Sequence, residues 1–303
     1  MKDKTKGNIA LLVTALVWGT GFIAQKLGNE VMPPMTFNAI RQLMASFVMF
    51  PIMLNAVKKN GYLSAELNTA EELRLKHIKM FKAYVFCGAF LLFGTMTQQI
   101  GLVTVSAGKS GFISGMYIVF TPIFAIIVGK KADIKTFLCV AIAMAGFAIL
   151  SLKGGLGGAT AGDWWTLVSA MGFAAQIVAV DKFVDKDNDL LISVLQFFFC
   201  GTVGLLIAVL AEHPAMSSIA AGIPVLLYST FVPTAIGYTF QIIGQKYTDS
   251  TTAALLMSLE SVFALIFGAI FFKEVMSLRE LLGCAVIMLA IVLDQVDIKS
   301  TGI

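Results

Sequence analysis

The chain has 303 residues, of which 58% are hydrophobic and only 13% are charged, and its mean hydropathy is +0.86. Soluble domains carry about 25% charged residues, so this composition excludes a soluble enzyme. The formal net charge of +4 is small, and the placement of the charges is more informative than their sum.

Ten apolar stretches follow one another along the chain, each long enough to cross a hydrocarbon core as an α-helix. They cover residues 8–28, 33–57, 81–104, 110–129, 135–152, 163–183, 190–211, 221–244, 250–272 and 278–297. Their apolar runs are continuous rather than alternating, which excludes a transmembrane β-barrel. We therefore predict an all-α integral membrane protein with ten transmembrane helices.

The first stretch follows Lys2, Lys4 and Lys6, a pattern that also occurs in secretory signal peptides. This stretch is longer than the apolar core of a signal peptide, contains Trp18, and is followed by nine more stretches. We therefore interpret it as the first membrane helix.

The longest connection, 58–80, is polar and mixed in charge. Thr69 and Glu72 have the spacing of a capping box, which predicts a short basic helix ahead of the third span. We interpret this connection as a solvated cytoplasmic loop, the alternative being a segment that binds a partner. Residues 154–162 are glycine-rich and form a predicted linker, and residues 298–303 form a predicted cytoplasmic tail.

Positive residues predict the orientation, because Lys and Arg concentrate in cytoplasmic connections. If the N-terminus is cytoplasmic, 16 of the 22 Lys and Arg residues fall on the cytoplasmic side and five on the other. The remaining one, Arg41, lies inside a span. We predict that both termini are cytoplasmic.

Two short patterns recur in the same order along the chain. Gly21-Phe22-Ile23-Ala24-Gln25 recurs 151 residues later as Gly172-Phe173-Ala174-Ala175-Gln176, and Gly94-x-x-x-Gln98-x-x-Gly101 recurs 143 residues later as Gly237-x-x-x-Gln241-x-x-Gly244. Together they predict two five-helix repeats, 1–153 and 163–297. Since five is odd, the second repeat enters the membrane from the opposite side, an arrangement typical of transporters that bind substrate near the midplane.

Further motifs carry a resemblance to a known family. They are Trp18-Gly19-Thr20-Gly21-Phe22, Arg41, Ala107-Gly108-Lys109-Ser110-Gly111-Phe112, Pro122 and Ser258-Leu259-Glu260. In this order they resemble the ten-helix EamA branch of the drug/metabolite transporter superfamily, over residues 8–297. One departure is Ser261, because the family often has proline after the glutamate; a proline-dependent kink is therefore not expected here.

The resemblance implies a bundle of two inverted five-helix halves with a central cavity, which works by alternating access. It also implies that the substrates are small polar or amphipathic metabolites, most commonly amino acids and their relatives, which are often exported. The resemblance does not specify a substrate.

Two ionisable residues lie inside predicted spans and are candidate substrate-binding residues, Glu260 and Arg41. Charged groups at membrane depth usually face the bundle interior and have a function. Glu260 is interpreted as a proton carrier, as a contact for a substrate amine, or as a structural group that pairs with Arg41 or caps a helix. Arg41 is interpreted as a bidentate partner for a substrate carboxylate or as a structural residue. Its repeat mate is Gln196, so the two halves differ chemically here.

The other candidate substrate-binding residues are aromatic or carry amides: Trp18, Phe22, Gln98, Tyr117, Gln176, Tyr238 and Gln241. Trp18 is at the middle of its span, so it either packs against lipid or forms a cavity wall. For each glutamine the alternative is an interhelical hydrogen bond, since unpaired amides are costly in hydrocarbon. The repeated pair Gln98 and Gln241 is the preferred polar lining.

No cofactor or metal site is predicted. The four cysteines lie singly in apolar stretches. Ala107-Gly108-Lys109-Ser110 contains the Gly-Lys-Ser of a phosphate-binding loop, but Val103 stands where the first glycine is required and no strand precedes it. An integral-membrane enzyme would need convergent His, Asp or Cys residues at membrane depth, and the spread of basic residues does not indicate nucleic-acid binding.

We therefore predict a secondary transporter, not an enzyme, in the cell membrane, which in a bacterium is the inner or plasma membrane. Its expected partners are a small-molecule substrate, the lipid bilayer and protons as a candidate coupling ion, with a monomer and a homodimer both left open. Alternatives are a nucleotide-sugar-type antiporter, a small-drug or cation exporter of the same superfamily, and a channel or structural membrane protein.

Overall fold

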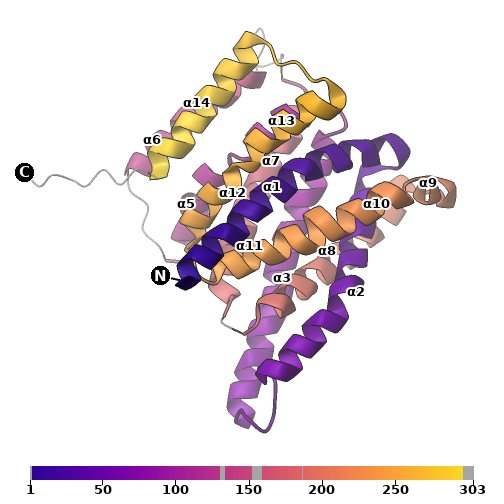
Figure 1. Cartoon of the computed structure of the whole chain (residues 1–303), viewed down its shortest axis with the longest axis vertical. Coiled ribbons are helices and arrows are strands. Elements are labelled where there is room, and N and C mark those ends of the chain that lie inside the picture. Colours follow the sequence, from indigo (N-terminus) through magenta and orange to yellow (C-terminus); the bar gives the residue numbers. More distant parts are fainter. Residues whose placement is uncertain (1, 130–133, 152–158, 186, 296–303) are drawn as a thin grey trace, which may run out of the picture.

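The computed structural model describes residues 2–129, 134–151, 159–185 and 187–295, and within these ranges it contains helices and no strand (Figure 1). Part of the predicted linker, 154–158, and the predicted tail, 298–303, lie outside the described residues. The helices are α1 (Lys2–Val31), α2 (Pro34–Asn60), α3 (Ala70–Gly101), α4 (Ala107–Ser114), α5 (Tyr117–Ile127), α6 (Ile134–Ser151), α7 (Ala161–Phe183), α8 (Asp189–Glu212), α9 (Met216–Ala221), α10 (Ile223–Ser229), the π-helix η2 (Thr230–Tyr238), α11 (Thr239–Gln245), α12 (Ser250–Ser258), α13 (Glu260–Phe272) and α14 (Leu278–Gln295).

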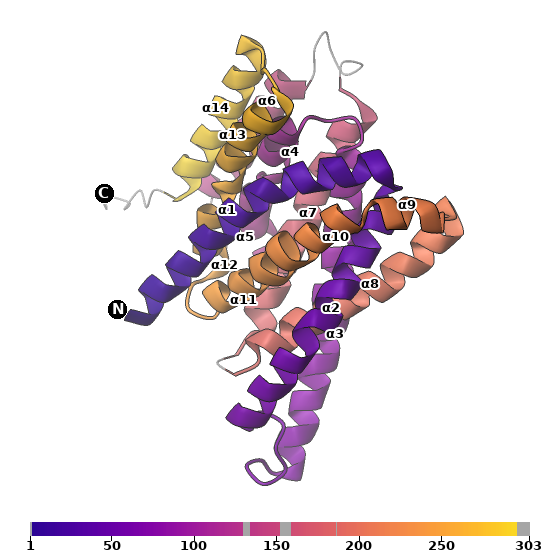
Figure 2. The same ribbon diagram turned by 45° about the vertical axis from the view of Figure 1, so that its right-hand side comes forward.

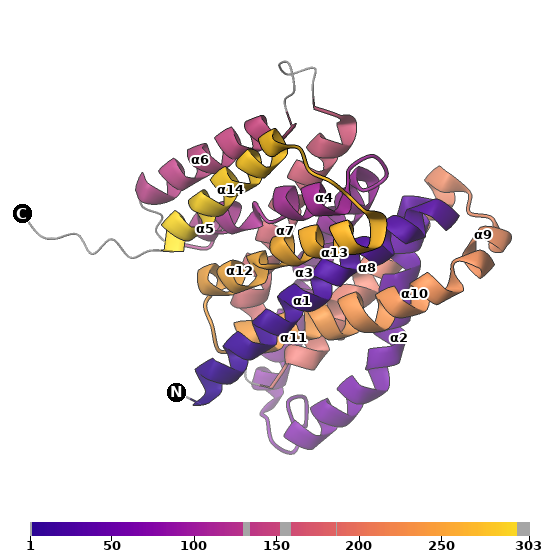
Figure 3. The same ribbon diagram turned by 45° about the horizontal axis from the view of Figure 1, so that its top comes forward.

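Eight helical stretches of the described chain are long and apolar enough to cross a membrane. They coincide with the predicted spans one to four and six to nine, so the prediction of an all-α membrane protein is confirmed. The other two predicted spans, 135–152 and 278–297, are helical as α6 and α14. These two helices pack against each other at one side of the bundle (Figures 1 and 3).

The connection between the second and third spans is shorter than predicted. Thr69 and Glu72 do form a capping box, but the helix that they start is α3 itself, which continues for 32 residues. At 1.5 Å per residue α3 is about 48 Å long, well beyond a hydrocarbon core of about 30 Å. The basic helix and the third span are therefore one helix, and α2 and α3 extend past the rest of the bundle (Figure 2).

Three of the spans are interrupted near their middles. The fourth span breaks at Gly115–Met116, between α4 and α5, and the ninth breaks at Leu259, between α12 and α13. At both points the backbone tightens, with hydrogen bonds from Met116 N to Ile113 O (3.2 Å) and from Val262 N to Leu259 O (3.1 Å). The eighth span contains the π-helix η2, which includes Pro233. The ninth span therefore breaks beside Glu260 without the proline that the family often has there.

The two predicted halves do not have separate cores. Helix α2 packs on α8, α3 packs on α7, and α1 packs on α11, α12 and α13, so each of these contacts joins one half to the other. The largest buried cluster likewise combines residues of α4, α5 and α6 with residues of α7, α12 and α14. A cavity between the halves is consequently surrounded by both.

The helix ends gather at two ends of the bundle. We call the end that carries the starts of α2, α4 and α7 the distal end, and the end that carries the starts of α3, α8 and α12 the proximal end. The halves touch at both. Lys109 pairs with Asp163 at the distal end (Nζ–Oδ1 2.7 Å), and Lys79 pairs with Asp185 at the proximal end (Nζ–Oδ2 2.6 Å).

Close backbone contact between α3 and α7 depends on two glycines. A Cβ atom at Gly172 would lie 2.7 Å from the Cα and N atoms of Gly94, which are backbone atoms and cannot turn away. We therefore expect Gly172→Ala to lower the free energy of unfolding by about 1–3 kcal/mol through overpacking, measured by thermal unfolding in detergent. At Gly204 the nearest atoms are side-chain ends at 3.2–3.3 Å, so Gly204→Ala is the matched control. Equal losses in both variants would contradict the predicted contact.

Candidate functional site

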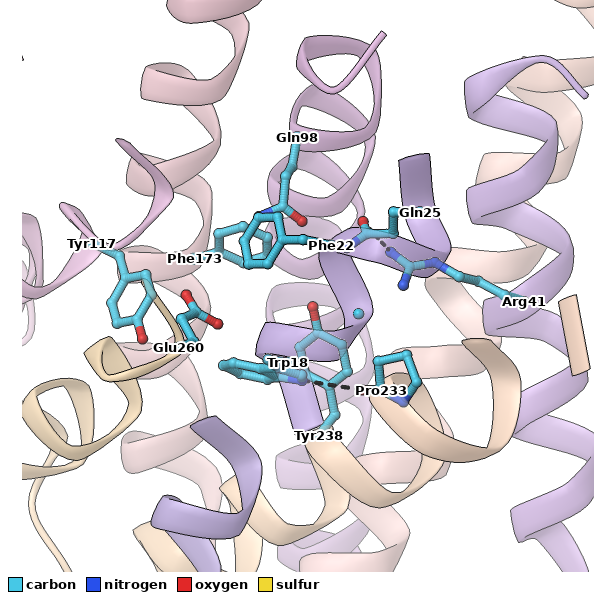
Figure 4. A pocket seen from close by; sticks show the side chains of 11 residues that line it. Trp18, Phe22, Gln25, Arg41, Gln98, Tyr117, Phe173, Pro233, Tyr238 and Glu260 are labelled. Carbon is cyan, nitrogen blue, oxygen red and sulfur yellow. Dashed lines mark hydrogen bonds between the residues drawn. The ribbon is translucent and has the colours of Figure 1, made fainter. Parts of the chain in front are cut away.

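A cavity lies between the two halves at the middle of the bundle (Figure 4). Water molecules can occupy about 30 Å³ of it, which is room for about two waters. The residues that line it are Trp18, Gly21, Phe22, Gln25, Arg41, Gln98, Tyr117, Phe173, Pro233, Tyr238 and Glu260. In this conformation the cavity is contracted, so any larger ligand requires the helices around it to move apart.

One face of α1 supplies a whole wall of the cavity. Trp18, Gly21, Phe22 and Gln25 are three or four residues apart, the spacing that places side chains on the same face of a helix. Gly21 leaves room for Pro233 of the facing span, because a Cβ atom at Gly21 would lie 3.0 Å from Pro233 Cβ. The first span is thus positioned by direct contact with the eighth.

The π-helix η2 meets α1 through side-chain hydrogen bonds. Trp18 Nε1 donates to Pro233 O (3.1 Å), and Thr14 Oγ1 donates to Gly237 O (3.1 Å). The Trp18 ring packs against Tyr238, with 4.8 Å between ring centroids. Long π-helical segments are rare and occur mostly at functional sites. Here the segment holds Pro233 and Tyr238 at the cavity wall.

Arg41 brings a positive charge to the cavity while it is only 2% exposed. Its guanidinium donates to amide oxygens, from Nε and Nη2 to Asn38 Oδ1 (3.2 and 2.9 Å) and from Nη2 to Gln25 Oε1 (3.2 Å). Asn38 in turn donates to Thr95 Oγ1 of α3 (3.0 Å). These partners are neutral, and among the described residues Arg41 makes no ion pair and Nη1 makes no hydrogen bond. No described residue therefore compensates this charge.

Glu260 brings a carboxyl group to the opposite side of the cavity and is 4% exposed (Figure 4). It is the first residue of α13, directly after the break at Leu259. Tyr117, the first residue of α5, lies beside it (Figure 4). The breaks in the fourth and ninth spans thus bring two polar side chains together. Within the described chain Glu260 makes no ion pair, so the predicted alternative of pairing with Arg41 is not found.

Seven of the nine residues that the sequence singled out line this cavity: Trp18, Phe22, Arg41, Gln98, Tyr117, Tyr238 and Glu260. Gln176 and Gln241 are buried but are not among the lining residues. Gln241 Nε2 donates to Gln176 Oε1 (2.9 Å) and to Gln245 Oε1 (3.0 Å), and Gln176 Nε2 donates to Gln196 Oε1 (2.9 Å). These amides join α7, α8 and α11 by interhelical hydrogen bonds.

Four lining residues were not among those candidates: Gly21, Gln25, Phe173 and Pro233. Two of them carried a signal in the sequence. Phe173 is the repeat mate of Phe22, and Gln25 is seven residues after Trp18, two helical turns along the same face. Pro233 carried no such signal, because its place depends on the π-helix. Of the residues repeated in the two halves, Phe22 and Phe173 thus both line the cavity, whereas Gln98 lines it and Gln241 does not.

Metal binding finds no support in the part of the chain that the structure describes. No group of three or more His, Cys, Asp or Glu residues is positioned to hold an ion. The four cysteines are buried as free thiols. The Gly-Lys-Ser segment forms the start of α4, where Ala107 N and Gly108 N donate to the Glu274 carboxylate rather than facing an open loop.

Known proteins similar to this chain match nearly its whole length. The model of the EamA-like transporter family matches residues 5–152 and, a second time, residues 160–293. An uncharacterized transporter of Archaeoglobus fulgidus is 27% identical over 287 residues, which cover 94% of this chain and 84% of that protein. A chloroplastic WAT1-related protein of Arabidopsis thaliana is 25% identical over 288 residues, which cover 91% of this chain and 66% of that protein.

A solved crystal structure has a similar fold. It matches with a TM-score of 0.66 and 15% sequence identity, and the match covers 96% of each chain. At that identity the likeness shows the fold alone.

The glutamine network predicts a difference in stability between two repeat-related positions. Gln241→Leu leaves the acceptors Gln176 Oε1 and Gln245 Oε1 without their donor, whereas Gln98→Leu frees only the Ser114 hydroxyl, which can turn to a backbone carbonyl. We expect Gln241→Leu to lower the free energy of unfolding by about 1–3 kcal/mol and Gln98→Leu to lower it less. Thermal unfolding in detergent measures both. A larger loss in Gln98→Leu would contradict this assignment.

Proposed function

The chain belongs to the EamA-like transporter family, and from that premise we propose that it is a secondary transporter of small dipolar organic solutes. Amino acids and related compounds are the proposed cargo, and alternating access between two inverted five-helix halves is the proposed mechanism. One observation carries the substrate class. The cavity contains one guanidinium and one carboxylate that are not paired with each other.

Unpaired charges at membrane depth need a counter-charge. Placing a charged side chain at the bilayer centre costs at least about 2.5–3.5 kcal/mol, and here the protein offers Arg41 only neutral partners. A substrate carboxylate would accept hydrogen bonds from Arg41, including the free Nη1 group, and a substrate ammonium would bind Glu260. Trp18, Phe22 and Phe173 would surround the apolar part of the same molecule.

The charge pattern also separates this proposal from its alternatives. A nucleotide sugar carries phosphates and would need several cations, but Arg41 is the single cationic side chain among the lining residues. A simple organic cation would bind Glu260 but would be repelled by Arg41. A solute with both charges satisfies both residues, which favours the dipolar class.

The contracted cavity and the broken helices support a cycle of conformations. Breaks in the fourth and ninth spans occupy corresponding positions in the two halves, and discontinuous helices in corresponding positions are typical of transporter binding sites. Each break is followed at once by a lining residue, Tyr117 or Glu260. Movement at either break would therefore change the cavity directly.

We propose that the proximal end faces the cytoplasm, because the sequence assigns 16 of the 22 Lys and Arg residues to the side of the membrane on which the N-terminus lies, and α1 begins at the proximal end. Export across the cell membrane is the proposed direction, and protons are the proposed coupling ion. Glu260 suits that role because it is the one acidic group among the lining residues. Substrate ammonium and proton would then compete for the same carboxylate.

The substrate class is tested by flux into proteoliposomes with a matched set of solutes. Leucine carries both charges, 3-methylbutylamine lacks the carboxylate, and 4-methylpentanoate lacks the ammonium. We expect saturable flux of leucine or another neutral amino acid and at least about tenfold slower flux of both analogues, the equivalent of one lost charged contact. Arg41→Met should remove this preference for the carboxylate, with Arg41→Lys retaining part of it. Equal flux of all three solutes would contradict a dipolar substrate.

Proton coupling is tested at Glu260. An amide cannot bind and release a proton, so we expect Glu260→Gln to abolish the stimulation of flux by an imposed pH gradient. Flux driven by the substrate gradient would remain, with a raised KM. Glu30→Gln removes an exposed carboxylate from α1 and is the matched control. Gradient-stimulated flux that persists unchanged in Glu260→Gln would remove the proton-carrier role.

A further inference from the structure

Two glutamates at the distal end each bind the first amides of a helix from the other half. Glu212, the last residue of α8, accepts hydrogen bonds from Met35 N (2.8 Å), Thr36 N (2.7 Å) and Thr36 Oγ1 (2.6 Å) at the start of α2. The start of α2 has no side-chain cap of its own, because Pro33 occupies that position. Glu212 therefore satisfies backbone donors that α2 itself leaves free.

Glu274 binds the start of α4, where the N-cap residue Ser106 accepts only from Lys109 N and leaves the first amides free. Its two oxygens accept from Ala107 N (2.8 Å) and Gly108 N (3.0 Å), and Lys26 of α1 approaches the carboxylate to 3.6 Å. Its side chain is only 12% exposed. The carboxylate occupies space that Gly268 leaves open, since a Cβ atom at Gly268 would lie 2.5 Å from Glu274 Oε2. The contact is thus enclosed by both halves.

The backbone beside both glutamates has an unusual conformation. His213 follows Glu212 and Lys273 precedes Glu274, with φ angles of 48° and 52°. They are the two residues other than glycine with positive φ in the described ranges. Side chains with a Cβ atom disfavour this left-handed region, and such strain concentrates at ligand clamps and switches. Both helices, α8 and α13, therefore end in strained turns where they contact the opposite half.

The paired arrangement exists at one end of the bundle alone among the described helices. Each contact joins corresponding spans of the two halves: Glu212 joins the second spans, α8 and α2, and Glu274 joins the fourth spans, α13 and α4. At the proximal end the starts of α8 and α12 receive bonds from acidic side chains of their own half. Asp189 Oδ1 accepts from Leu190 N (2.9 Å) on α8, and Asp249 Oδ1 accepts from Thr251 N and Thr252 N on α12.

We propose that Glu212 and Glu274 are a paired latch that holds the distal end closed, and that opening of this end requires both carboxylates to leave the amides of α2 and α4. The inference rests on the proposed function, since a latch matters only if that end opens. While the charge-assisted bonds are intact, the ends of α8 and α13 cannot separate from the first half. Once the end opens, water solvates the freed amides and carboxylates, so the latch is reversible.

The latch is tested by thiol labelling rather than by transport. Phe22→Cys places a thiol in the cavity wall of a protein whose four native cysteines are buried. A membrane-impermeant methanethiosulfonate reagent is applied to each face of proteoliposomes, whose orientation is read by proteolysis in the 61–69 connection at the proximal end. Glu212→Gln, Glu274→Gln and the double variant are compared in this background.

We expect labelling from the distal face to accelerate by about tenfold or more in the double variant, as the loss of charge-assisted bonds predicts, and labelling from the proximal face to stay equal or slow down. Glu280→Gln is the matched control. Glu280 is at the same end but binds Ser277 at the start of its own helix α14, so its loss should leave labelling unchanged.

Gly268→Ala provides a second route to the same state without a change in charge, because the added methyl group displaces the Glu274 carboxylate. It should accelerate distal labelling even if a glutamine variant fails to fold. Unchanged distal labelling in the double variant, or in Gly268→Ala and Glu212→Gln, would overturn the latch, and so would equal acceleration from both faces. Since labelling needs no substrate, a failure to transport any solute would refute the proposed function but leave this result readable.

Discussion

Two ionisable side chains that no described residue pairs, Arg41 and Glu260, are buried at the centre of this bundle and constrain its structure. Amide oxygens of Asn38 and Gln25 hold the Arg41 guanidinium, and Glu260 begins α13, where the amides of a first helical turn favour negative charge. These interactions reduce the cost of burial for each charge without neutralising either. Two nearby features belong to the same arrangement. Asn38 of α2 donates a hydrogen bond to Thr95 of α3, and the break in the ninth span places the Glu260 carboxyl group at the cavity.

The contacts between the halves differ in rigidity, which distinguishes the parts of the bundle that hold their positions from the parts that can bend. Helices α3 and α7 touch through glycines, so that pair resists separation in the middle of the bundle. The fourth, eighth and ninth spans are interrupted beside the cavity and can bend there with little loss of hydrogen bonds. In the proposed mechanism, rigid contacts between some spans and hinges in others would let the ends open while the centre stays assembled.

Hydropathy predicted the spans well, because backbone groups in lipid must bond within their own helix and long apolar runs have few other conformations. The length of α3 was missed, since its polar first turns carry no apolar signal. For Arg41 and Glu260 residue type was enough to predict a position inside the bundle, and both line the candidate cavity. Whether a glutamine amide faces the cavity depends on the rotation of its helix about the helix axis. The π-helix before Gln241 alters that rotation, and residue type does not reveal this change.

The two halves of the chain differ at several positions. If the halves were identical, the two end-open conformations would have equal energy. Arg41 is matched by Gln196, Gln98 lines the cavity while Gln241 lies behind it, and the glutamate contacts occur at the distal end. A symmetric architecture makes the two end-open conformations similar in energy, and a few kcal/mol then decides which one is populated. Charge-assisted bonds are of that size, and they differ between the ends, with the glutamate–amide contacts at the distal end and the Lys79–Asp185 pair at the proximal end. In the proposed cycle, repeat symmetry would make the alternation accessible, and the local differences between the halves would determine which end is closed in the absence of substrate.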